Sequence, residues 1–332
     1  MPTTSREIHL VQRPDGMPTE ADFALIETTV PDAAEGEVQV RNAYMSVDPA
    51  MRPRLSAGQA LDEAMGGGAV GRVVQSRNPD FKEGDIVQNR FGFREYFNSN
   101  GRGLQKLNPD PSLPLTVYMH VLGGSGFVAY GGLLDIGKMK DGEQVFVSTA
   151  AGSVGSVAVQ VAKIHGCYVI GSTGSDEKCR WLTEELGIDA AINYKTAPIR
   201  KSLKAAAPNG IDVYFDNVGG DHLDAALPRM NLLGRIAVCG MISAYNTPGS
   251  ISTGVTTLSN IIYGRVNIRG FVATDFPQLY EPFVHDMTGW LKEGRVKYEE
   301  TIMDGIENAP KALIGLLEGV NTGKMLVKLS DV

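Results

Sequence analysis

A glycine-containing turn in the middle of the chain joins a strand-like segment to a helical one. Residues 143–148 (EQVFVS) form a short apolar run of the kind found in buried parallel strands. Residues 150–155 (AAGSVG) follow, and from Val154 onward apolar side chains recur at helical spacing. Glycines let the backbone approach a pyrophosphate closely, and a helix N-terminus offers free N–H groups and positive dipole. The turn therefore has the context of a dinucleotide-binding loop.

The turn alone is ambiguous, because Ala150 replaces the first glycine of G-x-G-x-x-G and any tight strand–helix turn needs small residues. Its surroundings favour the dinucleotide. Further strand-like segments occur at residues 168–172, 190–194, 211–216, 235–239 and 267–271. Residues 176–186 have the pattern of a helix that ends at Gly187. Strands alternating with helices predict an α/β Rossmann fold, a doubly wound parallel sheet.

The end of the second predicted strand distinguishes between the two nicotinamide cofactors. A site for NAD places Asp or Glu about 20 residues after the glycines, where the acid binds the ribose hydroxyls. Here residues 171–175 read GSTGS, and Lys178 follows one turn into the next helix. Hydroxyl groups and a lysine suit a 2′-phosphate, which an acid would repel. The pattern favours NADP, although Lys178 taken alone could be an ordinary solvated lysine.

The two ends of the chain have a different sequence pattern, which is typical of β structure. In the first 120 residues, short alternating stretches such as residues 37–41 and 70–74 are separated by Gly, Pro, Asn and Asp, which is typical of a barrel-like β unit. The tail after about Arg295 is β-like again, for example at residues 325–329. We expect the tail to return to the first unit. The predicted domains are residues 1–125 with 296–332, and residues 126–295.

Composition narrows the function classes. The 332 residues carry a net charge of −7, and 43% are hydrophobic and 21% charged, which is globular composition. An acidic chain without basic clusters argues against nucleic-acid binding. No apolar run is long enough to span a membrane, and no secretory signal is apparent at the start. Three cysteines are too few for a disulfide framework, so we expect a reducing compartment, the cytoplasm.

With these motifs in hand, the sequence resembles the medium-chain dehydrogenase/reductase superfamily, and within it the leukotriene/prostaglandin reductases, plant double-bond reductases and bacterial curcumin reductases. The resemblance runs through nearly the whole chain. Its motifs lie at residues 42–49 with 51–52, 126–130, 150–155, 174–178, 215–220, 239–246, 261–263, 269–271 and 307–310. It implies a GroES-like β-barrel catalytic domain beside the Rossmann domain, NADPH as the cofactor, and a homodimer.

The resemblance also assigns cofactor contacts. Gly152, Ser153, Val154 and Gly155 are implied to meet the pyrophosphate. Gly174, Lys178 and Tyr194 are implied at the adenosine phosphate end. Asn217 is implied to bind the cofactor from the tip of the fourth strand. The residues implied to line the nicotinamide half are Cys239, Gly240, Met241, Ser243, Tyr245, Phe271, Val272, Ala273, Thr274 and Asn321. Purely structural roles stay open for several of them: Asn217 could cap a turn, Cys239 could fill the core, and Tyr194 could cover the sheet edge.

Two positions depart from the family pattern. Ala50 stands where family members commonly carry Tyr after Asp-Pro, and Val128 stands where they carry Thr. The first change could widen the substrate pocket. The second removes a hydroxyl that could contact the nicotinamide or its ribose. Both put the substrate preference in doubt more than the reaction type.

The chain contains no pattern of zinc ligands, because its five histidines are scattered and no Gly-His-Glu element occurs in the first domain. Without a Lewis acid, alcohol–ketone interconversion loses its usual means of stabilising an alkoxide. Reduction of an activated carbon–carbon double bond needs no metal: hydride adds at the β-carbon, the charge spreads onto the carbonyl oxygen as an enolate, and a proton reaches the α-carbon. We therefore expect metal-independent reduction of enones or enals.

That reaction needs a donor near the enolate and a source of the proton, and a tyrosine can serve as either. By resemblance, Tyr263 is the first candidate, beside the nicotinamide ribose, and Tyr44 at the mouth between the domains is the second. Tyr263 could also be a packing residue, and solvent could supply the proton. Quinone reduction and non-catalytic NADPH binding remain alternatives for the whole protein.

Overall fold

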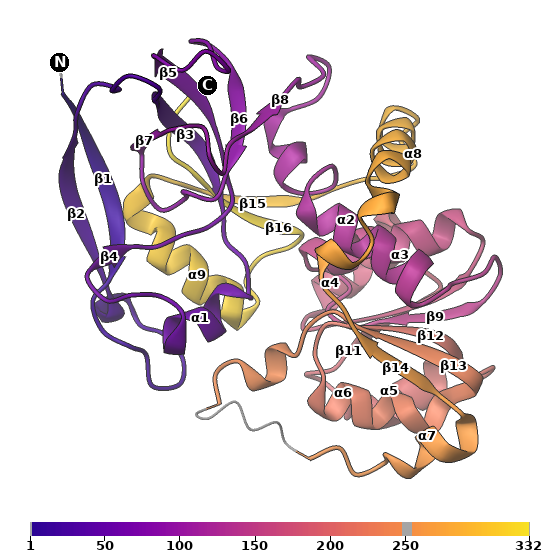
Figure 1. Cartoon of the computed structure of the whole chain (residues 1–332). Coiled ribbons are helices and arrows are strands. Elements are labelled where there is room, and N and C mark those ends of the chain that lie inside the picture. The colour runs from indigo at the N-terminus through magenta and orange to yellow at the C-terminus, as the bar shows by residue number, and fades with distance from the viewer. Residues whose placement is uncertain (1, 248–253, 332) are drawn as a thin grey trace. The chain divides into compact units, whose positions relative to one another are not determined.

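The strand-like segments in the middle of the chain form one parallel sheet (Figure 1). The computed structural model describes residues 2–247 and 254–331. The chain divides into one unit of residues Met1–Met119 with Glu300–Val332 and a second unit of residues His120–Glu299. The limits predicted from the sequence are 125/126 and 295/296, whereas these divisions fall at 119/120 and 299/300.

The sheet of the second unit has the strand order of a Rossmann fold. Within the described residues its order is β11-β10-β9-β12-β13-β14, and every neighbouring pair is parallel. Counted along the chain this is 3-2-1-4-5-6, the dinucleotide-binding order. The strands are β9 (Gln144–Val147), β10 (Tyr168–Thr173), β11 (Ala190–Asn193), β12 (Ile211–Asp216), β13 (Met230–Val238) and β14 (Asn267–Gly270). The predicted Rossmann fold is confirmed.

One strand begins earlier than its sequence pattern indicates. β13 starts at Met230 and not near Arg235, because the register with β12 shifts: Ile211 pairs with Met230, and Val213 pairs with Arg235. The extra residues form an exposed irregularity in which Leu233 has a φ of 63°. Strands are predicted from apolar residues that are buried in a regular pattern. The apolar residues at this bulge are exposed, so the sequence pattern did not indicate the start of the strand.

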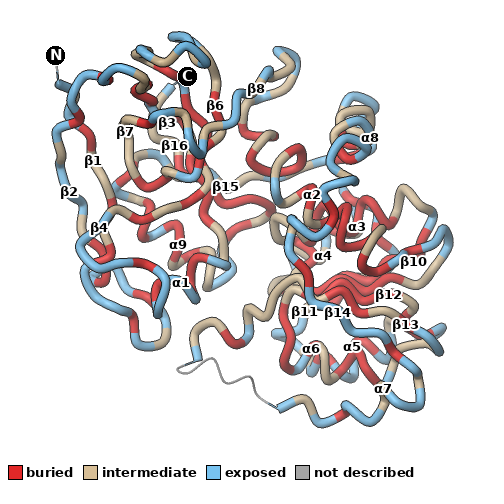
Figure 2. Tube along the Cα trace, viewed as in Figure 1, coloured by how far each residue is buried: buried red, intermediate tan, exposed pale blue. Residues whose placement is uncertain are grey.

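Helices cover both faces of this sheet, so its central strands are buried on both sides, whereas the edge strand β14 is exposed (Figure 2). Phe146, Ile170, Tyr214 and Ile236 are essentially inaccessible to solvent. This explains why the strands are continuous apolar runs and not alternating ones. The helices of this unit are α2 (Gly124–Gly131), α3 (Ser153–Ile164), α4 (Asp176–Arg180), α5 (Ile199–Ala206), α6 (Gly220–Ala226), α7 (Ser259–Gly264) and α8 (Tyr280–Lys292).

The first unit is largely β, as its turn-rich sequence predicts. Its barrel-like sheet has the order β15-β16-β3-β5-β6-β8, with β7 paired to β3, and a smaller sheet has the order β2-β1-β4. The elements are β1 (Thr3–Leu10), β2 (Phe23–Val30), β3 (Val38–Ser46), α1 (Met51–Ala57), β4 (Glu63–Ala64), β5 (Ala69–Ser76), β6 (Ile86–Asn89), β7 (Tyr96–Ser99), β8 (Gln105–Leu107), β15 (Glu300–Asp304), α9 (Ala309–Glu318) and β16 (Lys324–Lys328).

The tail returns to this first unit, as predicted. β16 pairs antiparallel with β3, where Leu326 lies opposite Ser46. Ala312 and Leu313 of α9 pack in one core with Ile8 and Met45. Among the described residues, no helix combines the length and apolar character that a membrane crossing requires.

The close packing of α3 on β9 leads to a prediction for two glycines. A β-carbon on Gly155 would lie 2.2 Å from the carbonyl oxygen of Thr149, so Gly155→Ala forces the backbone apart. We expect a loss of about 1–3 kcal/mol in the free energy of unfolding, measured by denaturant titration.

Gly289 in α8 is the matched control, because a β-carbon there meets nothing within 4 Å. In a helix interior, Gly→Ala stabilises by roughly 0.5–1 kcal/mol. The same substitution should therefore change stability in opposite directions at the two positions. Equal effects would contradict the packing explanation.

Candidate cofactor and catalytic site

The crevice of an open α/β sheet lies where the strand order reverses, at the carboxyl ends of the strands. In this sheet the reversal lies between β9 and β12, which are adjacent and parallel. Residues 148–155 follow β9, and residues 217–219 follow β12. Both predicted cofactor loops therefore meet at the same edge of the sheet.

The loop after β9 is shaped by close approach of its backbone. Thr149 has a φ of 51°, a left-handed conformation that is unfavourable for a β-branched residue. Gly155 permits the contact with the Thr149 carbonyl described above. Ser153 begins α3, and its hydroxyl donates to Ser125 Oγ over 2.7 Å. The free N–H groups of the first turn of α3 are the feature that binds pyrophosphates in Rossmann folds.

A buried carboxylate organises the loop after β12. Asp216 Oδ1 accepts hydrogen bonds from the Tyr214 hydroxyl (2.6 Å) and from the backbone N–H groups of Val218 (2.9 Å) and Gly219 (2.8 Å). The Ser148 hydroxyl at the end of β9 donates to the same oxygen over 3.2 Å. Oδ2 is buried and has no hydrogen-bond partner among the described residues. Burial raises the pKa of Asp216 and outweighs the lowering effect of its donors.

Asp216 also holds the loop after β13 through its backbone. Its carbonyl oxygen accepts from the N–H groups of Cys239 (2.8 Å) and Gly240 (3.1 Å). The Ser243 hydroxyl donates to the Val218 carbonyl over 2.6 Å. Burial, followed by the nearby Asp216 charge, raises the pKa of Cys239 to about 12, so this residue is a neutral thiol at pH 7. The loops that carry the expected nicotinamide contacts are thereby joined.

Asn217 and Tyr245 lie within this arrangement. Asn217 Nδ2 donates to the Ser148 carbonyl (2.7 Å), and its backbone N–H donates to Ser148 Oγ (2.9 Å). The Tyr245 hydroxyl accepts from the N–H of Met241 over 3.4 Å. The side chain of Asn217 thus links the end of β12 to the end of β9. Its role is therefore not limited to capping the turn that follows β12.

The last segment expected to contact the cofactor follows β14. Phe271 is buried, and its ring lies 6.0 Å from that of Phe215. Val272 is 62% exposed, and Ala273 begins a short 3₁₀ turn that includes Thr274. Phe271 therefore anchors the segment in the core, and the residues after it reach the surface.

The predicted adenosine residues come together at the ends of β10 and β11. A β-carbon on Gly174 would lie 3.2 Å from Tyr194 Oη and 3.2 Å from Lys195 Cε, so both side chains lie against this glycine. Burial lowers the pKa of Lys178, and the charge of Lys195 lowers it further. Two like charges held close together create a positive local potential, which favours an anion.

Lys195 was missed by the sequence analysis. It directly follows Tyr194 at the carboxyl edge of a predicted strand, and that position could have identified it. The hydroxyl groups of residues 171–175 are less available than the sequence suggests: Ser172 and Thr173 are buried, and Ser175 Oγ accepts from the Lys178 N–H as the N-cap of α4.

The two candidate catalytic tyrosines belong to different units. Tyr263 in α7 is 81% exposed, and its hydroxyl makes no hydrogen bond within the described residues. Tyr44 in β3 is half-buried and packs with Val70 and Leu326. Asn321, also in the first unit, is buried and donates from Nδ2 to the Gly323 carbonyl over 2.8 Å.

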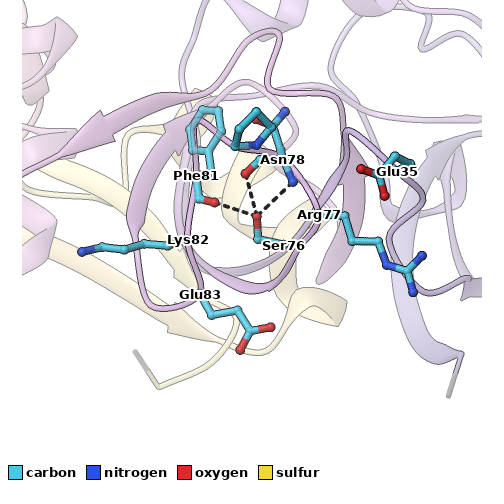
Figure 3. Close-up of a pocket in the computed structure, with 8 residues that line it drawn as sticks. Glu35, Ser76, Arg77, Asn78, Phe81, Lys82 and Glu83 are labelled. Atoms are coloured by element: carbon cyan, nitrogen blue, oxygen red, sulfur yellow. Dashed lines mark hydrogen bonds between the residues drawn. The ribbon is translucent and has the colours of Figure 1, made fainter.

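Neither a metal cluster nor the depression in the first unit adds to this site in the described residues. In residues 2–247 and 254–331, no three His, Cys, Asp or Glu side chains are grouped as metal ligands would be. Figure 3 shows a depression in the first unit, where the Ser76 hydroxyl donates to the carbonyls of Asn78 (3.2 Å) and Phe81 (2.7 Å). These bonds close a local turn, and none of the expected site residues line the depression.

Two family models match the chain. Residues 6–107 match a model described as the N-terminal domain of oxidoreductase. Residues 153–288 match one described as zinc-binding dehydrogenase. Together they include most of the barrel-like unit and most of the Rossmann unit, but not the C-terminal segment 300–332.

Characterised relatives extend over nearly the whole chain. The NADPH-dependent curcumin reductase of Escherichia coli (strain K12) is 40% identical, with 97% of this chain and 96% of the relative covered. The 2-alkenal reductase (NADP(+)-dependent) of Nicotiana tabacum is 39% identical, with 98% of each covered. The crystal structure of CurA in complex with NADPH from Vibrio vulnificus is 41% identical and has a TM-score of 0.93, with 98% of this chain and 100% of that chain covered. By fold, loop geometry and relatives, this chain belongs to the zinc-independent branch of the medium-chain dehydrogenase/reductase family.

Proposed function

We propose that this protein uses NADPH to reduce the carbon–carbon double bond of α,β-unsaturated ketones or aldehydes. The observation that carries the proposal is the joined set of loops at the β9/β12 edge, with two lysines at its adenosine end. The substrate class rests on the relatives, because a curcumin reductase and a 2-alkenal reductase both align with almost the whole chain.

The residues present fit NADPH. Gly152, Ser153, Val154 and Gly155 would hold the pyrophosphate at the start of α3. Gly174, Lys178 and Tyr194, with Lys195 beside them, would hold the 2′-phosphate, because two neighbouring cations gain most from a dianion. No acid lies at the end of β10, where it would bind the ribose hydroxyls of NAD and repel the 2′-phosphate of NADPH.

The nicotinamide half would lie along the loops after β12, β13 and β14. We assign to it the residues Asn217, Cys239, Gly240, Met241, Ser243, Tyr245, Phe271, Val272, Ala273 and Thr274, and Asn321 from the first unit. When bound, NADPH supplies a hydride. The thiol of Cys239 stays protonated, so this part of the site adds no thiolate beside the ring.

The side chains must then stabilise an enolate and allow its protonation. A neutral phenol can donate a hydrogen bond to the developing oxyanion and can release its proton to the α-carbon. We assign this role to Tyr263, with Tyr44 as the second candidate and water as the third. The hydroxyl of Tyr263 is free of protein partners within the described residues and is therefore available to a ligand.

We also propose the wider organisation of the protein. Residues 1–125 and 296–332 would form the catalytic domain, and residues 126–295 the cofactor domain. The protein would be a cytoplasmic homodimer: Cys167, Cys179 and Cys239 are free, and β14 ends the sheet with all its residues exposed. Ile262, in the helix that precedes this strand, is also exposed.

The function is tested by following NADPH oxidation with enals, enones, aryl-alkenones and quinones and identifying the products. We expect saturated ketones or aldehydes from the first three classes, at rates that exhaustive chelation does not change. Faster turnover of quinones would favour quinone reduction. Tight NADPH binding without turnover of any acceptor would indicate a binding protein.

The lysine pair leads to a prediction of cofactor preference. Lys178→Ala should raise the Kd of NADPH about 10-fold or more, because a charge-assisted hydrogen bond to the phosphate is lost, while the Kd of NADH changes little. Lys204→Ala on the exposed surface of α5 is the control. Equal affinity of the native protein for NADPH and NADH would overturn the assignment.

The same pair makes NADPH affinity depend on pH. Because the pKa of Lys178 is lowered in the free protein, and a bound phosphate favours the charged amine, affinity for NADPH should fall as pH rises through that lowered pKa. Affinity for NADH, which lacks the 2′-phosphate, should not follow this curve. Titrations of both cofactors between pH 7 and 10 provide the measurement.

Tyr263→Phe should lower kcat for enone reduction and leave the Kd of NADPH within a few-fold, because the enolate charge exists only around the transition state. General acid catalysis contributes about 10²–10⁴-fold, and rescue by solvent would bring the loss to the low end. Stability should be unchanged, because the side chain is exposed. Full turnover by this variant would transfer the role to Tyr44 or water.

A further inference from the structure

Tyr194, one of the residues expected at the adenosine phosphate end, makes a ring contact with His222. Tyr194 directly follows β11, and His222 lies in the first turn of α6. Their ring centroids are 5.1 Å apart and their planes meet at 81°, an edge-to-face pair. The Tyr194 hydroxyl makes no hydrogen bond within the described residues, and its side chain is 38% exposed. Packing, and not hydrogen bonding, therefore sets the orientation of this phenol.

His222 is the buried member of the pair. It is 5% exposed, and its Nε2 is buried without a hydrogen-bond partner among the described residues. Burial lowers the pKa of His222 to about 4, so the ring is neutral at pH 7. A buried nitrogen without a partner costs stability, and such groups in native proteins call for an explanation. The imidazole therefore acts as a flat, neutral ring, carried by α6, against which Tyr194 packs.

The other side of Tyr194 borders the phosphate residues. Its hydroxyl lies against Gly174, as does Lys195, and Lys195 is close enough to Lys178 to lower the pKa of that amine. Tyr194 thus stands between the buried ring of His222 and the two cations. A rotation of the phenol would move its hydroxyl away from Gly174.

We infer that His222 is a positioning residue for the adenosine phosphate end of the cofactor site, acting through the ring of Tyr194. The inference rests on the proposed binding of NADPH at Lys178 and Tyr194. α6 begins directly after the loop held by Asp216, so the ring of His222 reaches Tyr194 from the element that follows the β12 loop. This contact links the end of β11 to the loop after β12, where the strand order of the sheet reverses.

The test is binding of adenosine 2′,5′-bisphosphate and of NADPH, measured by calorimetry and fluorescence. His222→Ala should raise both Kd values about 3- to 10-fold, the range expected when an aromatic pair is lost. His222→Phe keeps an edge-to-face ring, so its Kd values should stay within about 2-fold of the native ones. It should also be at least as stable as the native protein, because the unpaired nitrogen is gone.

A double-mutant cycle separates positioning from a general loss of structure. If His222 acts through Tyr194, then His222→Ala should have little further effect on either Kd in a Tyr194→Ala background. If His222→Ala does not fold, His222→Leu replaces it, since leucine keeps most of the volume without a flat ring. His165→Ala removes a histidine that contacts Asp141 at the far end of α3 and should leave both Kd values unchanged.

Three results would overturn the inference: native affinity in folded His222→Ala, equal losses in His222→Ala and His222→Phe, or fully additive effects with Tyr194→Ala. Failure of the native protein to bind NADPH would instead overturn the proposed function. The two failures are therefore distinguishable.

Discussion

The buried carboxylate of Asp216 is the interaction on which the rest of the site depends. Moving a carboxylate out of water is costly unless hydrogen bonds replace its hydration, and here Tyr214, Val218 and Gly219 supply them to one oxygen. Because these donors come from β12 and the turn after it, the carboxylate fixes that turn. Ser148 extends the network to the end of β9. The two central strands are thereby joined at the edge where the sheet reverses its order.

The electrostatics of this edge change along its length. At one end, Lys178 and Lys195 concentrate positive charge beside Tyr194. At the other, the thiol of Cys239 is protonated. A cofactor with a phosphorylated adenosine and a neutral nicotinamide ring matches this gradient. The net charge of −7 gives no indication of it, because a pair of adjacent cations creates a local field that is independent of the sum over the chain.

Several features of the fold could be predicted because they depend on local sequence. The apolar runs of β9, β10 and β12 and the helical repeat after Val154 specify strands buried between helices. In a parallel sheet, the residues that follow the strands all lie at the carboxyl edge. Lys178 and Tyr194, which follow neighbouring strands, could therefore be expected close together at one end of that edge. Lys195 could have been found by the same reasoning. The early start of β13 could not, since it results from a register shift against β12.

The sequence by itself determined the alternation of strands and helices, the small residues of the cofactor loop, and the absence of an acid from residues 171–175. These follow from patterns within a few residues of one another. Only the tertiary structure decided the strand order, the closure of the Asp216 network and the contact of His222 with Tyr194. Each of these joins residues far apart in the chain. Burial among such residues raises the pKa of Asp216 and of Cys239 and lowers the pKa of His222, and the residues next to them in the sequence give no sign of these shifts.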